Sequence, residues 1–346
     1  MSLIRTGPYR YLAADRLAGV RLAYARHDRY LSRSETPSYM SGARIAHFGR
    51  VEWHIIPDSS TAAAGLQKGE IDWMHDLPTD LAPLLRRDRR ITVQVQDFIG
   101  GELYMRMNAL HPPFDNPAIR RAVLAGIDQD SFMQAAFGDD QSPTAAKTWR
   151  TPVGVWSLGK PMSADAGVEA MAADLPRARR LLAEAGYRGE KVVILHAGDY
   201  PMISAIGLVG ADLLRRMGFD VDVVTLEYSA GNQRRNSRNP PAQGGWNVFF
   251  GPFNGYNRYD PAAHVGINPA FSGWIPLDEI QALRDQWFDT PDLATRQAIA
   301  RQIQLLVWRD VPYIPLGNYS PLTAFRGLTG VLRGGATFSN VQRTST

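Results

Sequence analysis

A strand–helix–strand pattern in the second half of the chain constrains the fold more than any other feature. Lys191–His196 reads as a buried strand, Ile203–Met217 has helical periodicity and stops at Gly218, and Phe219–Leu226 reads as a second strand. A helix of this length between two strands is typical of a right-handed parallel crossover. The pattern therefore predicts an α/β fold, with Trp246–Phe250 as the next strand.

The first hundred residues also alternate short strands with helices. Val51–Ile56 has the alternation and β-branching of a strand, Ser59 stands where it can cap a helix running to Lys68, and Ile71–Trp73 begins another strand. We interpret this stretch as a βαβ-like unit. Further strands are expected at Arg21–Tyr24, Ile91–Gln96 and Leu103–Asn108, and a short helix at Leu77–Leu85.

The chain changes character near Asn108, where we expect a boundary between two lobes. His111–Asp140 opens with prolines and continues as two helical patterns. Residues 141–173 are rich in Pro, Gly, Ser and Ala and show little periodicity, which indicates a long surface excursion packed by Trp149 and Trp156.

The last sixty residues indicate a return to the first lobe. A helix is expected to start at Thr290, and Val311–Leu316 should follow it as a strand. The prolines at positions 312 and 315 favour an edge or crossover position for that strand. If the chain returns to the first lobe around Asn318, two connections join the lobes, as in a hinge.

The segment Trp246–Pro261, WNVFFGPFNGYNRYDP, has the composition of a loop that lines a ligand. Aromatic rings offer rigid contact area, while Asn, Tyr and Gly supply hydrogen bonds and allow close backbone approach. The alternative is plain packing around a glycine-rich bend. We favour ligand lining, because so many aromatic side chains cannot all face one core across such a flexible stretch. Four other tryptophans lie in regular elements and are expected in the core: Trp53, Trp73, Trp287 and Trp308.

No catalytic or metal-binding pattern stands out. The nucleophile-elbow, zinc-protease, phosphate-loop and dinucleotide motifs do not occur, and the seven histidines are scattered. His47 and His54 are expected to border a strand rather than hold a metal. Asp72, Asp76 and Asp80 repeat every four residues, but a proline interrupts any helix that would align them. We therefore expect no catalytic residue, no metal and no cofactor.

Composition excludes several classes of partner. The basic clusters lie on predicted helix faces among acidic residues and form no stripe with aromatics, so we expect no nucleic acid. The chain has no Cys, which suits an oxidising compartment and many cytosolic proteins alike. No apolar run approaches the ~18 residues of a membrane span, and the first residues lack the apolar stretch of a signal peptide.

Six segments, in order along the chain, carry a family pattern. They are TGPYRYL at 6–12, IIPDSSTAAAGLQKGEIDW at 55–73, MRMNALHPPFDNPAIRRAVLAGID at 105–128, ARRLLAEAGY at 178–187, GGWNVFF with YDP at 244–261, and RDVPYIPLGNY at 309–319. Together they resemble the family 5 extracellular solute-binding proteins of ABC importers, the group of the periplasmic oligopeptide, dipeptide and nickel binders.

The resemblance implies a bilobal α/β fold of the periplasmic-binding-protein type (type II) that closes on a ligand by a hinge, with an incomplete first lobe. By motif position, lobe I would comprise residues 1–107 plus 319–346, and lobe II residues 108–318. The strand ending at Asn108, the loop after Trp246 and the crossover near Asn318 would face the cleft. The implied ligand-binding residues are Arg106, Asn108, Trp246, Phe250, Phe253, Asn254, Tyr256, Asn257, Asp260, Asn318 and Tyr319.

The chain departs from the family pattern in two ways. Family members carry a signal peptide, the first strand of lobe I and an extra domain before the TGPY motif, which begins here at residue 6. We interpret the initial MSL as a leader on a fragment or as a shortened gene product. Peptide binders of the family also place an Asp in the loop after the aromatic strand, to pair with the α-ammonium of the ligand. Here the nearest positions hold Asn254 and Asn257, with Asp260 further on, and a neutral amide is a weaker anchor.

The favoured function is therefore a periplasmic solute-binding protein that takes peptides or similar small polar molecules and delivers them to an inner-membrane ABC permease, without catalysis. A ligand sensor or chaperone-like binding protein without a permease is the first alternative, and an α/β hydrolase or transferase is the second. The missing strand of lobe I would expose a sheet edge, so the sequence also allows a dimer of the fragment.

Overall fold

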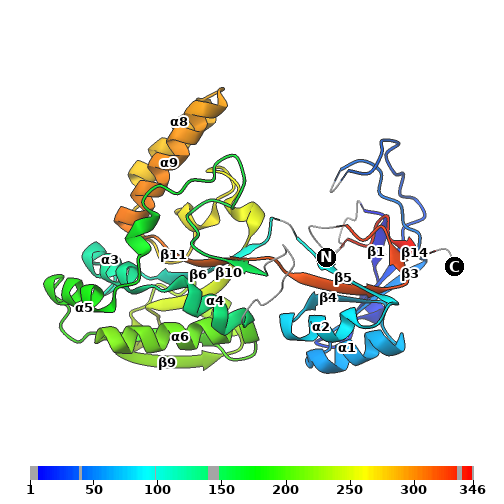
Figure 1. The fold of residues 1–346 in the computed structure, drawn as a ribbon, viewed down its shortest axis with the longest axis horizontal. Helices are drawn as coiled ribbons and strands as arrows, with labels where there is room; N and C mark the ends of the chain where they lie inside the picture. The colour runs from blue at the N-terminus through cyan, green and yellow to red at the C-terminus, as the bar shows by residue number, and fades with distance from the viewer. Residues whose placement is uncertain (1–6, 39–40, 98, 139–147, 333–336, 345–346) are drawn as a thin grey trace. The chain divides into compact units, whose positions relative to one another are not determined.

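The chain folds as two units, which are described one at a time. The computed structural model describes residues 7–38, 41–97, 99–138, 148–332 and 337–344 (Figure 1). Unit 1 comprises Met1–Phe98 and Ser320–Thr346, and unit 2 comprises Ile99–Tyr319. The sequence placed the first boundary near Asn108, and the structure places it before the strand that ends there.

Unit 1 contains two three-stranded antiparallel sheets and one short strand pair. The first sheet has the order β1-β2-β3 and the second the order β4-β12-β5, so the central strand of the second sheet comes from the end of the chain. The strands are β1 (Tyr9–Tyr11), β2 (Arg21–Arg26), β3 (Arg50–His54), β4 (Trp73–Leu77), β5 (Ile91–Val95), β12 (Leu322–Arg326), β13 (Leu328–Thr329) and β14 (Gln342–Arg343), and the helices are α1 (Ser59–Lys68) and α2 (Ala82–Arg86).

Three expectations for unit 1 need correction. The strands β3 and β4 belong to different sheets, so the predicted βαβ-like unit does not form a paired crossover. The N-cap of α1 is Asp58, whose carboxylate accepts the Thr61 N–H at 2.6 Å, and Ser59 is already the first helical residue. Leu77 ends a strand rather than beginning a helix.

Unit 2 is built on a six-stranded sheet of order β7-β11-β6-β10-β8-β9. The pairs β8–β9 and β10–β8 are parallel and the others antiparallel, so the predicted strand–helix–strand crossover is confirmed. The strands are β6 (Gly101–Met107), β7 (Trp149–Arg150), β8 (Lys191–Ala197), β9 (Asp220–Leu226), β10 (Val248–Asn254) and β11 (Ile314–Tyr319). The helices are α3 (Pro117–Gly126), α4 (Gln129–Phe137), α5 (Leu175–Glu184), α6 (Pro201–Met217), α7 (Tyr228–Arg234), α8 (Asp278–Asp289) and α9 (Leu293–Asp310).

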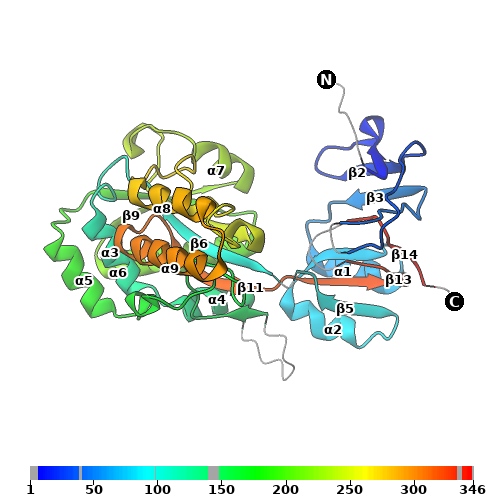
Figure 2. The same ribbon diagram turned by 90° about the horizontal axis from the view of Figure 1, so that it is seen from above.

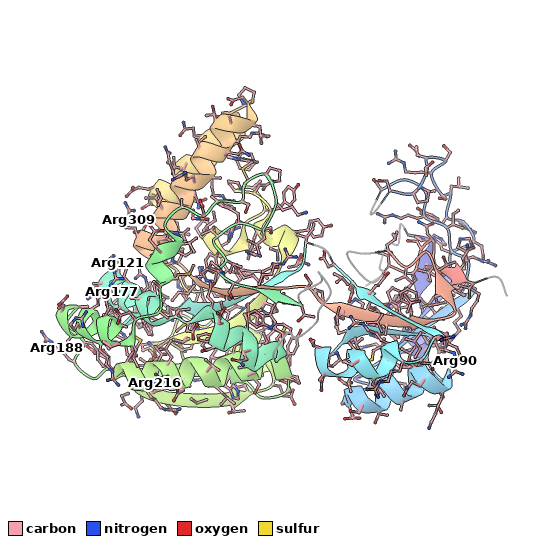
Figure 3. All side chains as sticks on the ribbon, viewed as in Figure 1. Arg90, Arg121, Arg177, Arg188, Arg216 and Arg309 are labelled. Carbon is pink, nitrogen blue, oxygen red and sulfur yellow. The ribbon has the colours of Figure 1, made fainter. Side chains whose placement is uncertain are left out.

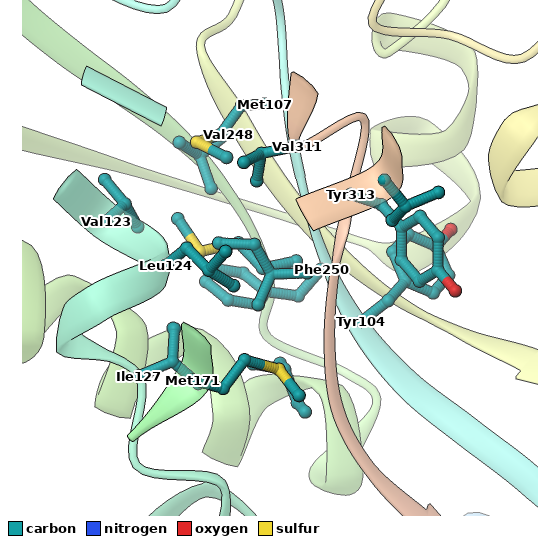
Figure 4. Close-up of a cluster of buried hydrophobic side chains, with 14 of the residues drawn as sticks. Tyr104, Met107, Val123, Leu124, Ile127, Met171, Val248, Phe250, Val311 and Tyr313 are labelled. Carbon is teal, nitrogen blue, oxygen red and sulfur yellow. The ribbon is translucent and has the colours of Figure 1, made fainter. Parts of the chain in front are cut away.

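The main core of unit 2 lies between this sheet and its helices. Helix α6 packs on β8, β9 and β10 and also against α4, while α8 and α9 pair with each other (Figure 2). Figure 4 shows part of the core, where Phe250 of β10 is surrounded by apolar side chains from several elements. Strands β6 and β10 are buried on both faces, as expected for strands in the middle of a covered sheet.

Arginine side chains cover the outer faces of several helices. Arg177, Arg188 and Arg216 point away from the core of unit 2, and Arg90 is exposed on unit 1 (Figure 3). Among the described residues, no helix is both long enough and apolar enough to cross a membrane.

Candidate functional site

The start of β6 and the ends of β10 and β11 lie side by side at one end of the sheet in unit 2. Gly101, the first residue of β6, is the register partner of Asn254 at the end of β10 and of Tyr319 at the end of β11. The Asn318 side-chain amide donates a hydrogen bond to the Gly101 carbonyl at 2.8 Å. The structure thus brings together the loop after β10 and the end of β11, two segments that the family resemblance associates with a ligand.

The residues Gly255–Arg258 form one 3-10 turn directly after β10. Asn254 caps this turn by accepting a backbone N–H of the turn at 3.2 Å. The N–H of Gly255 donates to the Gly100 carbonyl at 2.7 Å. A Cβ atom on Gly255 would lie 2.2 Å from Ile99 Cγ2, so only glycine fits where the turn approaches the start of β6.

Ser157 fastens both ends of the turn. Its hydroxyl donates to the Gly255 carbonyl at 2.6 Å, and its N–H donates to the Arg258 carbonyl at 3.1 Å. Ser157 is itself fully buried. The backbone of the turn is therefore held by neighbours on two sides, while Tyr256 and Asn257 between these anchors are half-buried.

A buried ion pair lies on the inner side of the turn. Nη1 of Arg258 contacts Oε2 of Glu102 in β6 at 2.6 Å, and both side chains are fully buried. Burial raises the pKa of Glu102 to about 8, although the Arg258 charge acts in the opposite direction. His264 and Tyr313 lie nearby. Nε2 of His264 is 3.1 Å from the Tyr313 hydroxyl and from the Val155 carbonyl, and burial lowers the pKa of His264 to about 3.

Five of the expected ligand residues are exposed or half-buried and stand at this place: Asn254, Tyr256, Asn257, Asp260 and Tyr319. Asn254 and Asp260 already have structural tasks, because each caps a backbone N–H. The Asp260 carboxylate accepts the Ala263 N–H at 3.0 Å. Tyr256 and Asn257 stay predicted ligand residues on the half-buried part of the turn.

Arg106 requires a correction. Its guanidinium is fully buried and donates to the carbonyls of Ser272, Gly266 and Phe271 at 2.7, 2.6 and 3.3 Å. The side chain also lies over the Phe271 ring. Arg106 therefore joins β6 to the 266–272 segment from a fully buried position.

Asn108 and Trp246 are corrected for the same reason. The Asn108 side chain donates to the Trp246 carbonyl at 2.9 Å and accepts the Leu110 N–H at 3.0 Å. Trp246 is fully buried and packs edge-on against Phe249 at 5.0 Å between ring centroids. Both residues hold the entry to β10 rather than face solvent.

Phe250 and Phe253 belong to the core as well. Phe250 fills the space above Gly210 of α6, and Phe253 stacks on Tyr104 with ring centroids 3.9 Å apart. These contacts are those of core packing, which was the alternative to the ligand-lining interpretation. Ligand lining stays a prediction for the turn that follows.

Asn318 and Tyr319 stand at the same strand ends with structural contacts. Asn318 is nearly buried and bonded to Gly101, as described above. Tyr319 is half-buried, stacks on Phe137 at 5.2 Å and covers Gly101. Both side chains therefore contact other residues of unit 2 at the border of the candidate site.

Glu102, Arg258 and Ser157 were missed by sequence reasoning. Glu102 stands in an apolar strand, where a carboxylate needs a partner, and this was the available signal. The partner is 156 residues away in sequence, so only the fold could identify it. No local pattern marks Ser157.

Unit 1 has a hollow of about 660 Å³ of its own, bordered by the edge strands β3 and β4. Trp53 and Trp73 line it and are partly buried. Trp73 packs against the small core cluster of Phe325, Leu328 and Val341, so the predicted core position is wrong for Trp53 only. Trp287 and Trp308, in contrast, are buried as predicted. Among the described residues, no group of three or more His, Asp or Glu side chains has the arrangement of a metal site.

Comparison with known proteins identifies the family. The family model for bacterial extracellular solute-binding proteins, family 5 (Middle), matches residues 1–266. A probable peptide ABC transporter periplasmic-binding protein, y4tO, from Sinorhizobium fredii is 32% identical over 345 residues, covering 95% of this chain and 62% of the relative. A glutathione-binding protein, GsiB, from Pectobacterium atrosepticum is 23% identical, covering 94% of this chain and 61% of the relative. The chain thus spans about six-tenths of the length of these relatives.

Solved structures show the same fold. The ABC transporter-associated periplasmic binding protein DppA from Helicobacter pylori, in complex with the peptide STSA, superimposes with a TM-score of 0.79 at 19% identity, covering 98% of this chain and 63% of that chain. The α/β architecture is therefore that of the periplasmic binding proteins. With the family model matching most of the sequence, the chain belongs to the bacterial extracellular solute-binding proteins of family 5.

Proposed function

We propose that this protein is the substrate-binding component of an ABC importer for peptides or similar small polar solutes, acting in the periplasm and delivering its ligand to a membrane permease. The observation that carries the proposal is the turn Gly255–Arg258. A rigidly held turn with a half-buried tyrosine and an amide, at the common end of three strands, can bind a solute without large ordering cost. Family membership and the names of the relatives support the solute class.

The amides at the turn suggest how the solute is recognised. Asn257 offers both a donor and an acceptor and carries no charge, so it suits a polar neutral group better than an ammonium group. The ligand is therefore a small polar molecule or peptide whose charged amino terminus is not the main anchor.

Binding and variants at the turn test the proposal. Native mass spectrometry of protein secreted to the periplasm should reveal a co-purifying small molecule, and calorimetry with that molecule should give its affinity. Tyr256→Ala should weaken binding at least ten-fold while leaving the unfolding midpoint within the error of the wild type. Asn257→Asp should favour peptides with a free amino terminus over their N-acetylated forms, because it adds the charge that the turn lacks.

Two outcomes separate the importer from the sensor. A bound ligand together with stimulation of a permease in membrane vesicles supports the importer. A bound ligand without any such stimulation supports the sensor. If ligand closes two lobes by a hinge, as the family resemblance implies, it should also lower the radius of gyration in solution scattering.

A further inference from the structure

The ion pair beneath the turn is incompletely satisfied. Arg258 and Glu102 are both 0% exposed and share one contact of 2.6 Å. Oε1 of Glu102 and Nε and Nη2 of Arg258 are also buried, and they have no hydrogen-bond partner among the described residues. Buried polar atoms without partners lower the free energy of unfolding, so the pair is poorly explained as a stabilising element.

The pair instead determines where the turn lies. Arg258 is the last residue of the turn, whereas Glu102 lies in β6, between Phe253 of β10 and Asn318 of β11 in register. The link therefore joins the turn to the middle strand of three. Replacing a buried ion pair by apolar side chains is often neutral or stabilising, and in some proteins such a pair serves to select one arrangement of the chain.

We propose that Glu102 and Arg258 are positioning residues for solute binding, which hold Tyr256 and Asn257 in one arrangement without touching the solute. The part of this proposal that concerns solute binding rests on the proposed function. The hold on the turn can be tested without any ligand, because backbone exchange reports directly on how firmly the turn is held.

The hold on the turn should depend on pH. Since the pKa of Glu102 is about 8, its carboxyl group is mostly protonated at pH 6.5 and mostly ionised at pH 8.5. When the turn opens locally, Arg258 moves away while Glu102 stays buried in β6, so the pKa of Glu102 rises further. The opened form then binds the proton more tightly than the held form, so the turn should be held more firmly at the higher pH, in contrast to global unfolding, which exposes Glu102 to water. The neutral His264, whose pKa is about 3, and Tyr313, whose pKa is raised by burial, do not change charge in this range. The other charged groups close to this cluster are the arginines Arg106 and Arg284.

Hydrogen–deuterium exchange of the 346-residue chain tests the proposal. The first variant is the double substitution E102L/R258M, which removes the pair without stranding either charge. We expect it to unfold cooperatively at a midpoint equal to or above that of the wild type, while the amides of Gly255–Arg258 exchange at least ten-fold faster. Glu279→Gln is the matched control, because Glu279 pairs with Arg309 on an exposed surface of the same unit.

The second variant, Glu102→Gln, keeps the side-chain shape and removes the titration. In the wild type, exchange of these amides, corrected for the intrinsic effect of pH, should be faster at pH 6.5 than at pH 8.5, and Glu102→Gln should abolish this difference. Affinity for glutathione and for the peptide Ser-Thr-Ser-Ala serves as a further readout and should fall at least ten-fold in the double variant.

Wild-type exchange in a folded double variant would overturn the positioning role. If the double variant does not fold, an unchanged pH difference in Glu102→Gln would overturn it equally. If neither probe binds the wild type, that result counts against the proposed solute class alone, and the exchange data still decide the role of the pair.

Discussion

The predicted ligand residues of unit 2 fall into two groups. Some pack in the interior of the unit, and the others lie on the turn after β10 or next to it. Phe250 and Phe253 lie on opposite faces of β10. A sheet covered on one face would therefore bury only one of these two sets of side chains. Here the strand is buried on both faces, and both sets enter the core. Composition alone could not reveal this, because aromatic residues suit a core and a ligand surface equally well. The strand expected at Trp246–Phe250 lies at Val248–Asn254, so the turn begins later than the sequence indicated, at Gly255.

Arg106 provides a direct test of the structural assignment at this scale. Arg106→Met leaves three buried carbonyl groups without their donor, so the free energy of unfolding should fall by about 3–5 kcal/mol. Arg177→Met, on an exposed face of α5, should change it by less than about 0.5 kcal/mol. Urea unfolding followed by tryptophan fluorescence measures both. A stable Arg106→Met variant with weakened binding would restore the ligand role instead.

Trp246 and Tyr256 should respond in opposite ways. Trp246→Ala opens a cavity in the core and should cost about 3–5 kcal/mol in unfolding free energy. Tyr256→Ala should cost less than about 1 kcal/mol and act on affinity instead. Thermal unfolding alongside calorimetry distinguishes the two effects. Equal destabilisation by both substitutions would contradict the placement of the turn at the surface.

Glu102 should also give the whole protein a pH-dependent stability. Its pKa of about 8 in the folded protein lies above the ordinary value of about 4.3 in an unfolded chain. Between these values the unfolded state has released the proton and the folded state has kept it, so the free energy of unfolding falls as pH rises. Above pH 8 this contribution levels off. Urea titrations from pH 5 to pH 8 should show a shallower decline in Glu102→Gln than in the wild type.

Secondary-structure elements were predicted well where local signals decide them. Helix α6 shows a clear apolar face and ends at Gly218, which has a left-handed backbone with φ of 111°. Strand β4 was missed over most of its length, because its sequence WMHDL contains no β-branched residue. It is held instead by β12, about 250 residues later. Pairing over such a distance leaves no local pattern.

Two glycines in helices should separate packing from helix propensity. A Cβ atom at Gly210 of α6 would lie 2.2 Å from the Phe250 ring, so Gly210→Ala should destabilise the protein by about 1–3 kcal/mol. Gly231 of α7 has nothing within 4 Å of the same position, and Gly231→Ala should stabilise the protein by up to about 1 kcal/mol. Urea midpoints of the two variants decide this. A neutral Gly210→Ala would mean that Phe250 moves aside without cost.

For the molecule as a whole, the chain divides into the units Met1–Phe98 with Ser320–Thr346 and Ile99–Tyr319, whereas the family resemblance implies lobes of 1–107 with 319–346 and of 108–318. Strand β6 pairs with β10 and β11, which fixes it in unit 2, whereas its sequence gives no indication of which sheet it joins. The cut at 108–318 would have removed this strand from its sheet. The dimer of the chain stays a prediction, which sedimentation at several concentrations would test.

Unit 2 should fold by itself. Its first strand begins at Gly101 and its last ends at Tyr319, and these residues are register partners, so excision leaves two neighbouring ends. A protein of residues 99–319 should unfold cooperatively and keep the exchange pattern of the turn Gly255–Arg258. The matched control is a protein of residues 108–318, which lacks β6 and should not give a cooperative transition.

The order of the strands also bears on how the protein is made. The centre of the second sheet in unit 1 is β12, which lies near the end of the chain, whereas its partners β4 and β5 lie within the first hundred residues. During synthesis on the ribosome, β4 and β5 emerge first. They stay unpaired with β12 until the whole of unit 2 has been synthesised. The second unit along the chain can therefore finish folding before the first one, and the early strands depend on the last few dozen residues for their completion.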